Sequence, residues 1–252
     1  MNADVRRRIA FVAALLLLVS ALLQFAAAAQ RWLFFDAGAL ASEVSVEGHM
    51  YDYTFPTESW QSIGSAALLF GIGYLLLAVA MVILTVAVVP HSAGLTVAAV
   101  APLVAASPAL IGIRAALSGL NGAPAFLGPI AEGGFMTFGV AQLVGLGLLT
   151  AFARRQSAVL GAGVVFLFGT TITGYLVATF WIVPMAVGYV SHDTTPWTEA
   201  FAAVCTMMAA MAVYAGRTVT TVPAGRPDPI ADRAADPNRP GEWTGPLARR
   251  RV

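Results

Sequence analysis

Runs of about twenty consecutive apolar residues recur along this chain, and few folds accommodate them. They fall at about 9–29, 63–89, 93–117, 135–153, 157–188 and 198–216. An α-helix needs about 20 apolar residues to cross the hydrocarbon core of a bilayer. Only 11% of the residues are charged, against about 25% in soluble domains. The sequence therefore predicts an all-α integral membrane protein, with a six-helix transmembrane bundle over residues 1–217.

The arginines divide unevenly between the two sides that six such helices define. With the N-terminus inside, cytoplasmic segments hold twelve of them: Arg6, Arg7, Arg8, Arg154, Arg155, Arg217, Arg226, Arg233, Arg239, Arg249, Arg250 and Arg251. The outer side holds Arg31 and Arg114. Because cytoplasmic loops accumulate positive residues, we expect a multi-pass protein of the plasma (inner) membrane with both termini in the cytoplasm.

The first apolar run allows two interpretations. It follows three arginines and ends in AAAAQ, which resembles the cleavage site of a signal peptide. It is also longer than the 7–15 apolar residues of a normal signal peptide. We expect an uncleaved first helix, and in either case residue 30 emerges on the outer side.

The last segment, residues 218–252, has a different composition. It contains six prolines and almost no bulky apolar residues. Such a segment cannot bury a core. We expect a disordered cytoplasmic tail rich in proline and arginine.

Composition also excludes several kinds of chemistry. All 14 basic residues are arginine, so Schiff-base lysine chemistry and a P-loop lysine are impossible. Cys205 is the only cysteine, which excludes an intrachain disulfide and a cysteine-clustered metal site. No GxSxG, HExxH or Walker A motif occurs, and no GxGxxG follows a strand. We expect no enzyme activity, no cofactor and no nucleic-acid partner.

The outer loop between the first two helices, residues 30–62, is the most polar stretch before the tail. It carries one arginine and five carboxylates, for a net charge of −4. Alternation in EVSV and MYDYTF is compatible with a short β-hairpin that turns at Glu47–Gly48. We expect a small cap above the bundle that contacts a partner through Glu43, Glu47, His49, Tyr51, Asp52, Tyr53 and Trp60.

A metal site on the outer face is a weaker hypothesis. Imidazole and carboxylate groups suit zinc, copper or manganese, and the candidate ligands are His49, His192 and Asp193. These residues come from distant loops, and no HxH or HxxxH pair exists. An outer-face cation sensor is therefore kept only as an alternative.

A solute path is the other alternative, and its candidate residues are Pro108, Arg114, Thr171 and Tyr175. Pro102 and Pro108 should kink or loosen the third helix. Arg114 should reach the headgroups or pair with Glu132 or Glu199. The threonine-rich fifth span is expected to be one helix, whose hydroxyl groups serve helix packing. No pair of carboxylates lies mid-span, and the middle of the membrane is nearly free of ionisable groups, which disfavours an ion-coupled carrier.

The second outer loop, residues 118–135, is rich in glycine and has two prolines, from which we expect no regular structure. It joins helices whose small residues allow close packing with other membrane subunits or with a second copy of the chain.

The function that the sequence favours is a non-catalytic accessory or scaffold subunit of a bacterial envelope complex. A transporter or channel for a small solute or ion is the alternative.

Overall fold

The computed structural model describes residues 2–34, 52–54, 60–90, 94–188 and 197–217. These ranges are almost entirely helical and contain no strand, and all of them belong to one compact unit, residues 1–220. The all-helical class predicted from the sequence is confirmed for this part of the chain. The hairpin expected around Glu47–Gly48 and the tail 218–252 lie outside the described residues.

The helices follow one another in chain order. They are α1 (Ala3–Ala29), the π-helical turn η1 (Gln30–Phe34), α4 (Ala66–Val88), α5 (Gly94–Asn121), α6 (Pro129–Gln156), α7 (Ala158–Phe166), the 3₁₀ turn η3 (Leu167–Thr170), α8 (Ile172–Val177), the π-helical turn η4 (Ala178–Ile182), α9 (Val183–Val187) and α10 (Thr198–Gly216). Five segments are long and apolar enough to cross a membrane: α1 with η1, α4, α5, most of α6, and α10. The segment from α7 to α9 makes a sixth if its two bent halves are counted as one span. These helices are consistent with a multi-pass membrane protein.

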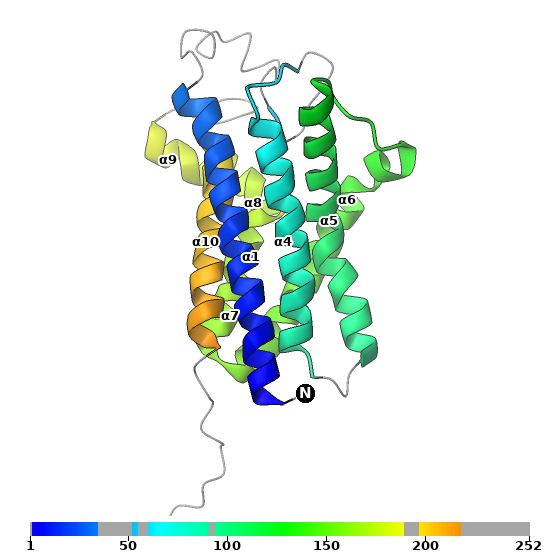
Figure 1. Cartoon of the computed structure of the whole chain (residues 1–252), viewed down its shortest axis with the longest axis vertical. Coiled ribbons are helices and arrows are strands. Elements are labelled where there is room, and N and C mark those ends of the chain that lie inside the picture. Colours follow the sequence, from blue (N-terminus) through cyan, green and yellow to red (C-terminus); the bar gives the residue numbers. More distant parts are fainter. Residues whose placement is uncertain (1, 35–51, 55–59, 91–93, 189–196, 218–252) are drawn as a thin grey trace, which may run out of the picture. The chain divides into compact units, whose positions relative to one another are not determined.

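Neighbouring helices close into a ring. α1 packs against both α4 and α10, α5 against α4 and α6, and α7 against α6 and α10 (Figure 1). The first and last helices are therefore in direct contact. α1, which the sequence also allowed as a signal peptide, contributes the fully buried Leu17 and Ala21 to this packing.

Two ends of the bundle can be distinguished by their arginines. At the Arg217 end, the guanidinium of Arg217 lies 4.9 Å from the ring centroid of Phe11 on α1. Gln156 at the end of α6 donates to the carbonyl of Val88 at the end of α4. Six of the eight described arginines belong to this end, since they occupy the first turns of α1, the last turn of α6 and the end of α10: Arg6, Arg7, Arg8, Arg154, Arg155 and Arg217. The opposite end is called the Arg31 end below.

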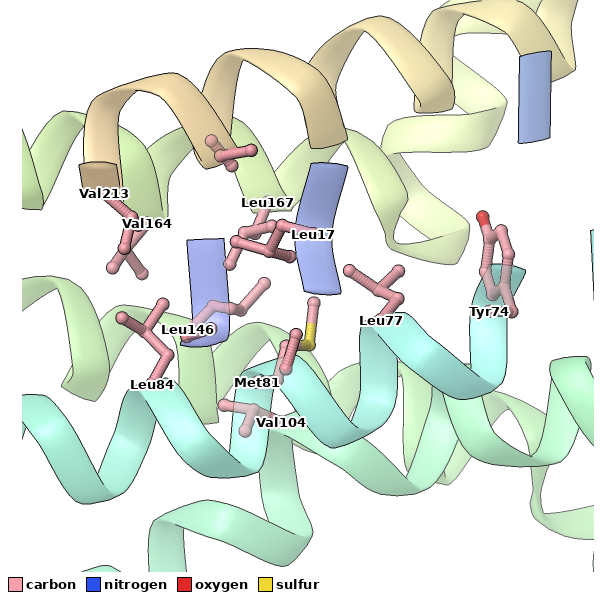
Figure 2. Close-up of a cluster of buried hydrophobic side chains, with 14 of the residues drawn as sticks. Leu17, Tyr74, Leu77, Met81, Leu84, Val104, Leu146, Val164, Leu167 and Val213 are labelled. Atoms are coloured by element: carbon pink, nitrogen blue, oxygen red, sulfur yellow. The ribbon is translucent and has the colours of Figure 1, made fainter. Parts of the chain in front are cut away.

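The core toward the Arg217 end is aliphatic. Figure 2 shows side chains from four sides of the ring converging, among them Met81 of α4, Val104 of α5, Leu146 of α6 and Leu167 of η3. Burying such groups away from water stabilises a fold by about 25 cal/mol per Å² of apolar surface. In a bilayer, dispersion contacts take over much of this role.

Helices α4 and α5 approach each other closely through glycines. A Cβ atom built on Gly71 would lie 2.3 Å from the backbone nitrogen of Ala116, and one on Gly112 would lie 2.9 Å from the carbonyl oxygen of Gly71. Only glycine permits this separation. α5 runs unbroken through Pro102 and Pro108, so the proline-rich third span forms one helix.

The fifth span differs from the single helix expected. Its halves, Ala158–Thr170 and Ile172–Val187, meet at an angle of 72°. The hydroxyls of Thr170 and Thr171 donate to the carbonyls of Leu167 and Phe168, both at 2.7 Å. These side-chain hydrogen bonds replace helical ones, and Thr171 then turns extended (ψ 161°) and caps α8. The prediction of one continuous helix was wrong because the threonines terminate it.

The second outer loop is shorter than predicted. Helix α5 continues to Asn121 and α6 begins at Pro129, so only residues 122–128 connect them. Gly119 lies inside α5, and a Cβ atom built there would lie 2.6 Å from the backbone nitrogen of Leu68 on α4, so glycine allows the two helices to approach closely. Pro129 occupies the first turn of α6, where its missing N–H has no cost. The expectation of no regular structure is confirmed for residues 122–128 and was wrong for residues 118–121 and 129–135, where glycine and proline serve helix packing and helix initiation.

Candidate functional site

A buried ion pair joins the first and last helices at the Arg31 end. Arg31, in η1, is 3% exposed and Glu199, in the first turn of α10, is 0% exposed. The Arg31 Nη1 atom donates to Oε1 of Glu199. The indole Nε1 of Trp32 donates to the second oxygen, Oε2, at 3.1 Å. Both carboxylate oxygens therefore have partners, as a buried charge requires.

Residues 52–54 of the first loop are also buried at this ion pair. The Asp52 Oδ1 atom lies 3.8 Å from Nη1 of Arg31, and both side chains are almost inaccessible. The same oxygen accepts a hydrogen bond of 2.8 Å from the backbone nitrogen of Thr54. One guanidinium thus faces two carboxylates, one from the first loop and one from α10. The charges of Arg31, Asp52 and Glu199 sum to −1.

The position of Glu199 in its helix helps to hold the second negative charge. Helix α10 begins at Thr198, so the Glu199 carboxylate lies in the first turn. The N-terminus of a helix carries a partial positive charge that favours anions. Trp197, immediately before it, adopts a left-handed conformation with φ 70°.

Aromatic rings form the wall of the site. The Arg31 guanidinium lies 4.6 Å from the ring centroid of Trp32 and 5.7 Å from that of Tyr53. The Tyr53 ring packs at 5.0 Å against Phe70, and Phe70 at 4.4 Å against Tyr74, both on α4. Burial raises the pKa of the Tyr53 phenol well above its usual value, and the charge of Glu199 raises it further. Tyr53 is therefore neutral at physiological pH.

Helix α8, which follows the break in the fifth span, also reaches this cluster. Tyr175 is buried and lies close enough to Asp52, Glu199 and Arg31 to interact with their charges. Thr171 lies one turn earlier, at the break itself. Five side chains are thus assembled from η1, the first loop, α8 and α10; we name them the Arg31 cluster: Arg31, Asp52, Tyr53, Tyr175 and Glu199.

The four residues of the predicted solute path are not brought to one place. Tyr175 belongs to the Arg31 cluster, whereas Arg114 is half-buried on α5 with its guanidinium 5.6 Å from the ring centroid of Phe135. Pro108 is buried two turns earlier in α5. Glu199, proposed from the sequence as a partner of Arg114, is instead bound to Arg31. The side chain of Glu132 lies outside the described residues.

Part of the predicted partner surface lies against the bundle. Asp52, Tyr53 and Trp60 are each buried by 95% or more. The remaining predicted contact residues and metal ligands lie outside the described ranges: Glu43, Glu47, His49, Tyr51, His192 and Asp193. Within the described ranges, no three His, Cys, Asp or Glu residues are grouped so that they could hold a metal ion.

Sequence reasoning did not identify the ion pair. Arg31 counted only as one of the two arginines on the outer side, and Glu199 was considered as a partner of Arg114 and not of Arg31. One signal was available, because a lone arginine beside an apolar run needs a partner when its helix is packed.

Comparison of the chain with protein-family models, with curated proteins and with solved structures finds no match.

Proposed function

We propose that this protein is an accessory or scaffold subunit of a bacterial envelope complex, without catalytic activity of its own, that works by association with other membrane proteins. The observation that carries the proposal is the burial of Asp52, Tyr53 and Thr54 at the Arg31 cluster. The first loop is fastened at this point to α1, α4 and α10. The carboxylate of Asp52 lies against Arg31 in the interior of the protein, so this part of the loop acts as a structural anchor.

An anchored loop suits recognition. Ordering a segment before it meets a partner reduces the conformational entropy lost on binding. The segment that precedes the anchor contains Glu43, Glu47, His49 and Tyr51, a mixture of acidic and aromatic residues. Aromatic residues are enriched at protein interfaces. The proposed partner is therefore a membrane protein with a basic outer surface.

The experiment substitutes four side chains of the loop and keeps the residues that anchor it to the bundle. Glu43→Gln, Glu47→Gln, His49→Ala and Tyr51→Ala are combined in one variant, and Asp52 to Thr54 are left unchanged. Complexes are cross-linked in native membranes, purified under matched expression and quantified by mass spectrometry. We expect specific partners to be lost from the loop variant while its membrane level stays constant.

The control for this experiment is a variant at the opposite end, Arg154→Gln with Arg155→Gln. It changes charge to a similar extent without touching the first loop. If the wild type, the loop variant and the control retain the same partners in the same amounts, the first loop is not a recognition surface and the proposal fails.

The proposal also places both termini in the cytoplasm and the Arg31 end outside. The support is the concentration of six of the eight described arginines at the Arg217 end, because positive residues are retained on the cytoplasmic side. Cys205 is the only cysteine and is buried. Single cysteines can therefore be placed at exposed positions by Gly122→Cys and Arg155→Cys in a Cys205→Ala background. An impermeant maleimide added to intact spheroplasts should label residue 122 and spare residue 155; the reverse pattern overturns the orientation.

A second candidate function, passage of a small solute or ion, is favoured by the 72° break in the fifth span. Interrupted membrane helices commonly line binding sites of transporters. Here α8 brings Tyr175 to buried charges. Proteoliposomes containing the wild type should then take up small neutral solutes faster than empty liposomes, with the rate lowered by Tyr175→Phe or Arg114→Ala. Equal uptake in all preparations would exclude this candidate.

A further inference from the structure

Gln142 is a polar side chain enclosed in the centre of the bundle. It is 0% exposed and shares one stripe of α6 with the equally buried Leu146, Leu149 and Ala153. Neither its amide nitrogen nor its amide oxygen has a hydrogen-bond partner among the described residues. A buried amide without partners is costly, and native structures normally supply a partner, a water molecule or a ligand.

Ser107 of α5 lies at the same level of the bundle as Gln142, by the register of the two helices. One turn closer to the Arg217 end, a Cβ atom on Gly145 of α6 would lie 2.8 Å from a methyl carbon of Val104 on α5. Because α5 and α6 run antiparallel, one further turn along each helix brings Ser107 and Gln142 to the same level. Ser107 is 0% exposed, and its hydroxyl has no hydrogen-bond partner in the part of the chain that the structure describes.

The Ser107 hydroxyl differs from several other hydroxyls within the helices. The hydroxyls of Thr85, Thr150 and Thr206 donate to the carbonyl four residues earlier in their own helix, at 2.7–2.8 Å. Ser107 makes no such bond. Its hydroxyl is therefore available to a group outside its own helix.

Pro108 adds an acceptor at the same level. Proline has no N–H, so Pro108 cannot donate to the carbonyl four residues earlier, which is that of Val104. The carbonyl of Val104, the hydroxyl of Ser107 and the amide of Gln142 together offer donors and acceptors on two facing helices. Ser107 and Gln142 do not bond each other.

The charge around this position is low. α4 and the segment α7–α9 contain no Asp, Glu or Arg, and α10 contains only Glu199, which is bound to Arg31. The nearest charged residue on α5, Arg114, is about two turns from Ser107. A charged ligand would have no counter-charge here.

We propose that Gln142 and Ser107 form a binding site for a small uncharged molecule that presents a hydrogen-bond donor and an acceptor side by side, as a primary amide does. The amide of Gln142 can pair with such a group through both of its polar atoms at once. Ser107 supplies a third contact. This inference does not depend on the scaffold function, since the site lies inside the bundle and away from the first loop.

The test measures binding of acetamide to the purified protein in lipid nanodiscs by saturation-transfer NMR. Acetate serves as the charged analogue of the same shape. We expect saturable binding of acetamide and none of acetate. Gln142→Leu should weaken acetamide binding about tenfold or more, because it removes the paired hydrogen bonds.

Two further variants keep the test decisive if Gln142→Leu fails to fold. Ser107→Ala removes a single contact and should weaken binding by a smaller factor. Thr206→Val is the matched control, because its buried hydroxyl is already bound within its own helix, and it should bind acetamide as the wild type does. Absence of acetamide binding to the wild type, equal binding by the wild type and the two site variants, or equal binding of acetate would each overturn the proposal.

Discussion

Arg31 and Glu199 lie 168 positions apart in the sequence and form a buried ion pair. The pair joins η1, at the end of α1, to the start of α10, and therefore closes the helix ring at the Arg31 end. At the other end of the same two helices, Arg217 lies against Phe11, and the Phe11 and Tyr214 rings are 6.2 Å apart. An arginine thus holds the first and last helices together at each end, by charge at one and by aromatic contact at the other.

Removing one member of the buried pair should destabilise the protein strongly. Arg31→Met leaves two buried carboxylates facing each other, and loss of one partner in such a pair costs about 3–5 kcal/mol. The double variant Arg31→Met with Glu199→Leu should recover part of this loss, because only Asp52 then keeps a buried charge without Arg31. Unfolding in mixed micelles with increasing SDS measures all four proteins of the double-mutant cycle.

The matched control for this cycle is Arg217→Met at the opposite end. It removes a partly exposed cation–π contact and should cost only about 0.5–1 kcal/mol. If Arg31→Met and Arg217→Met are equally stable, or if the effects of the two single substitutions simply add, the ion pair does not close the ring as described.

The positions of the helices could be predicted from the sequence, but the shape of the fifth one could not. Apolar length alone locates α4 or α10, since bilayer thickness sets the length of a spanning helix. In the segment around Thr171 the same apolar composition fits a straight or a broken helix. The choice depends on whether each hydroxyl bonds the carbonyl three or four residues earlier, which composition does not encode.

The candidate site was still harder to predict. Asp52 and Glu199 read as loop carboxylates, because nothing local shows that they become buried at Arg31. Their burial follows from the contact between the first and last helices, which is a long-range property. Gln142 was hidden in a different way, since a single glutamine barely changes the mean hydropathy of a helix that is otherwise apolar.

The phenol of Tyr53 should make stability sensitive to alkaline pH. Its pKa is raised in the folded protein, whereas an unfolded chain ionises tyrosine near pH 10. The contribution is fully present below about pH 10 and is lost as the pH rises from there through the folded pKa, at up to about 1.4 kcal/mol per pH unit.

Tyr53→Phe tests this dependence. The phenol oxygen is buried and makes no hydrogen bond among the described residues, so the variant should match or slightly exceed the wild type in stability at pH 7. Between pH 10 and pH 11 it should lose less stability than the wild type, as measured by thermal unfolding in detergent. Parallel pH profiles for the two proteins would contradict the assignment.

Close packing of α4 on α5 predicts a large effect from one added methyl group. Gly71→Ala would place a Cβ atom 2.3 Å from the backbone nitrogen of Ala116 and 2.7 Å from the carbonyl oxygen of Gly112. The helices must then separate, at a cost of about 1–3 kcal/mol. Gly147→Ala is the control: it lies inside α6 with no atom within 4 Å of the added Cβ, so its effect should be neutral or stabilising by up to about 1 kcal/mol. Similar losses of stability in both variants would show that the effect of alanine does not come from the contact between α4 and α5.

The break in the fifth span should depend on Thr171. Its hydroxyl accepts from the backbone nitrogen of Gly174 at 3.0 Å and donates to the carbonyl of Phe168, so it satisfies a group on each side of the bend. Thr171→Ala leaves both groups without this partner in a buried position and should cost about 0.5–2 kcal/mol, the usual range for a lost helix cap. Thr150→Ala removes a hydroxyl that bonds only the Leu146 carbonyl of its own helix, and because alanine is the better helix former it should be neutral or slightly stabilising. Thermal unfolding of the two variants separates these cases, and a Thr171→Ala protein as stable as Thr150→Ala would mean that the bend is held by packing alone.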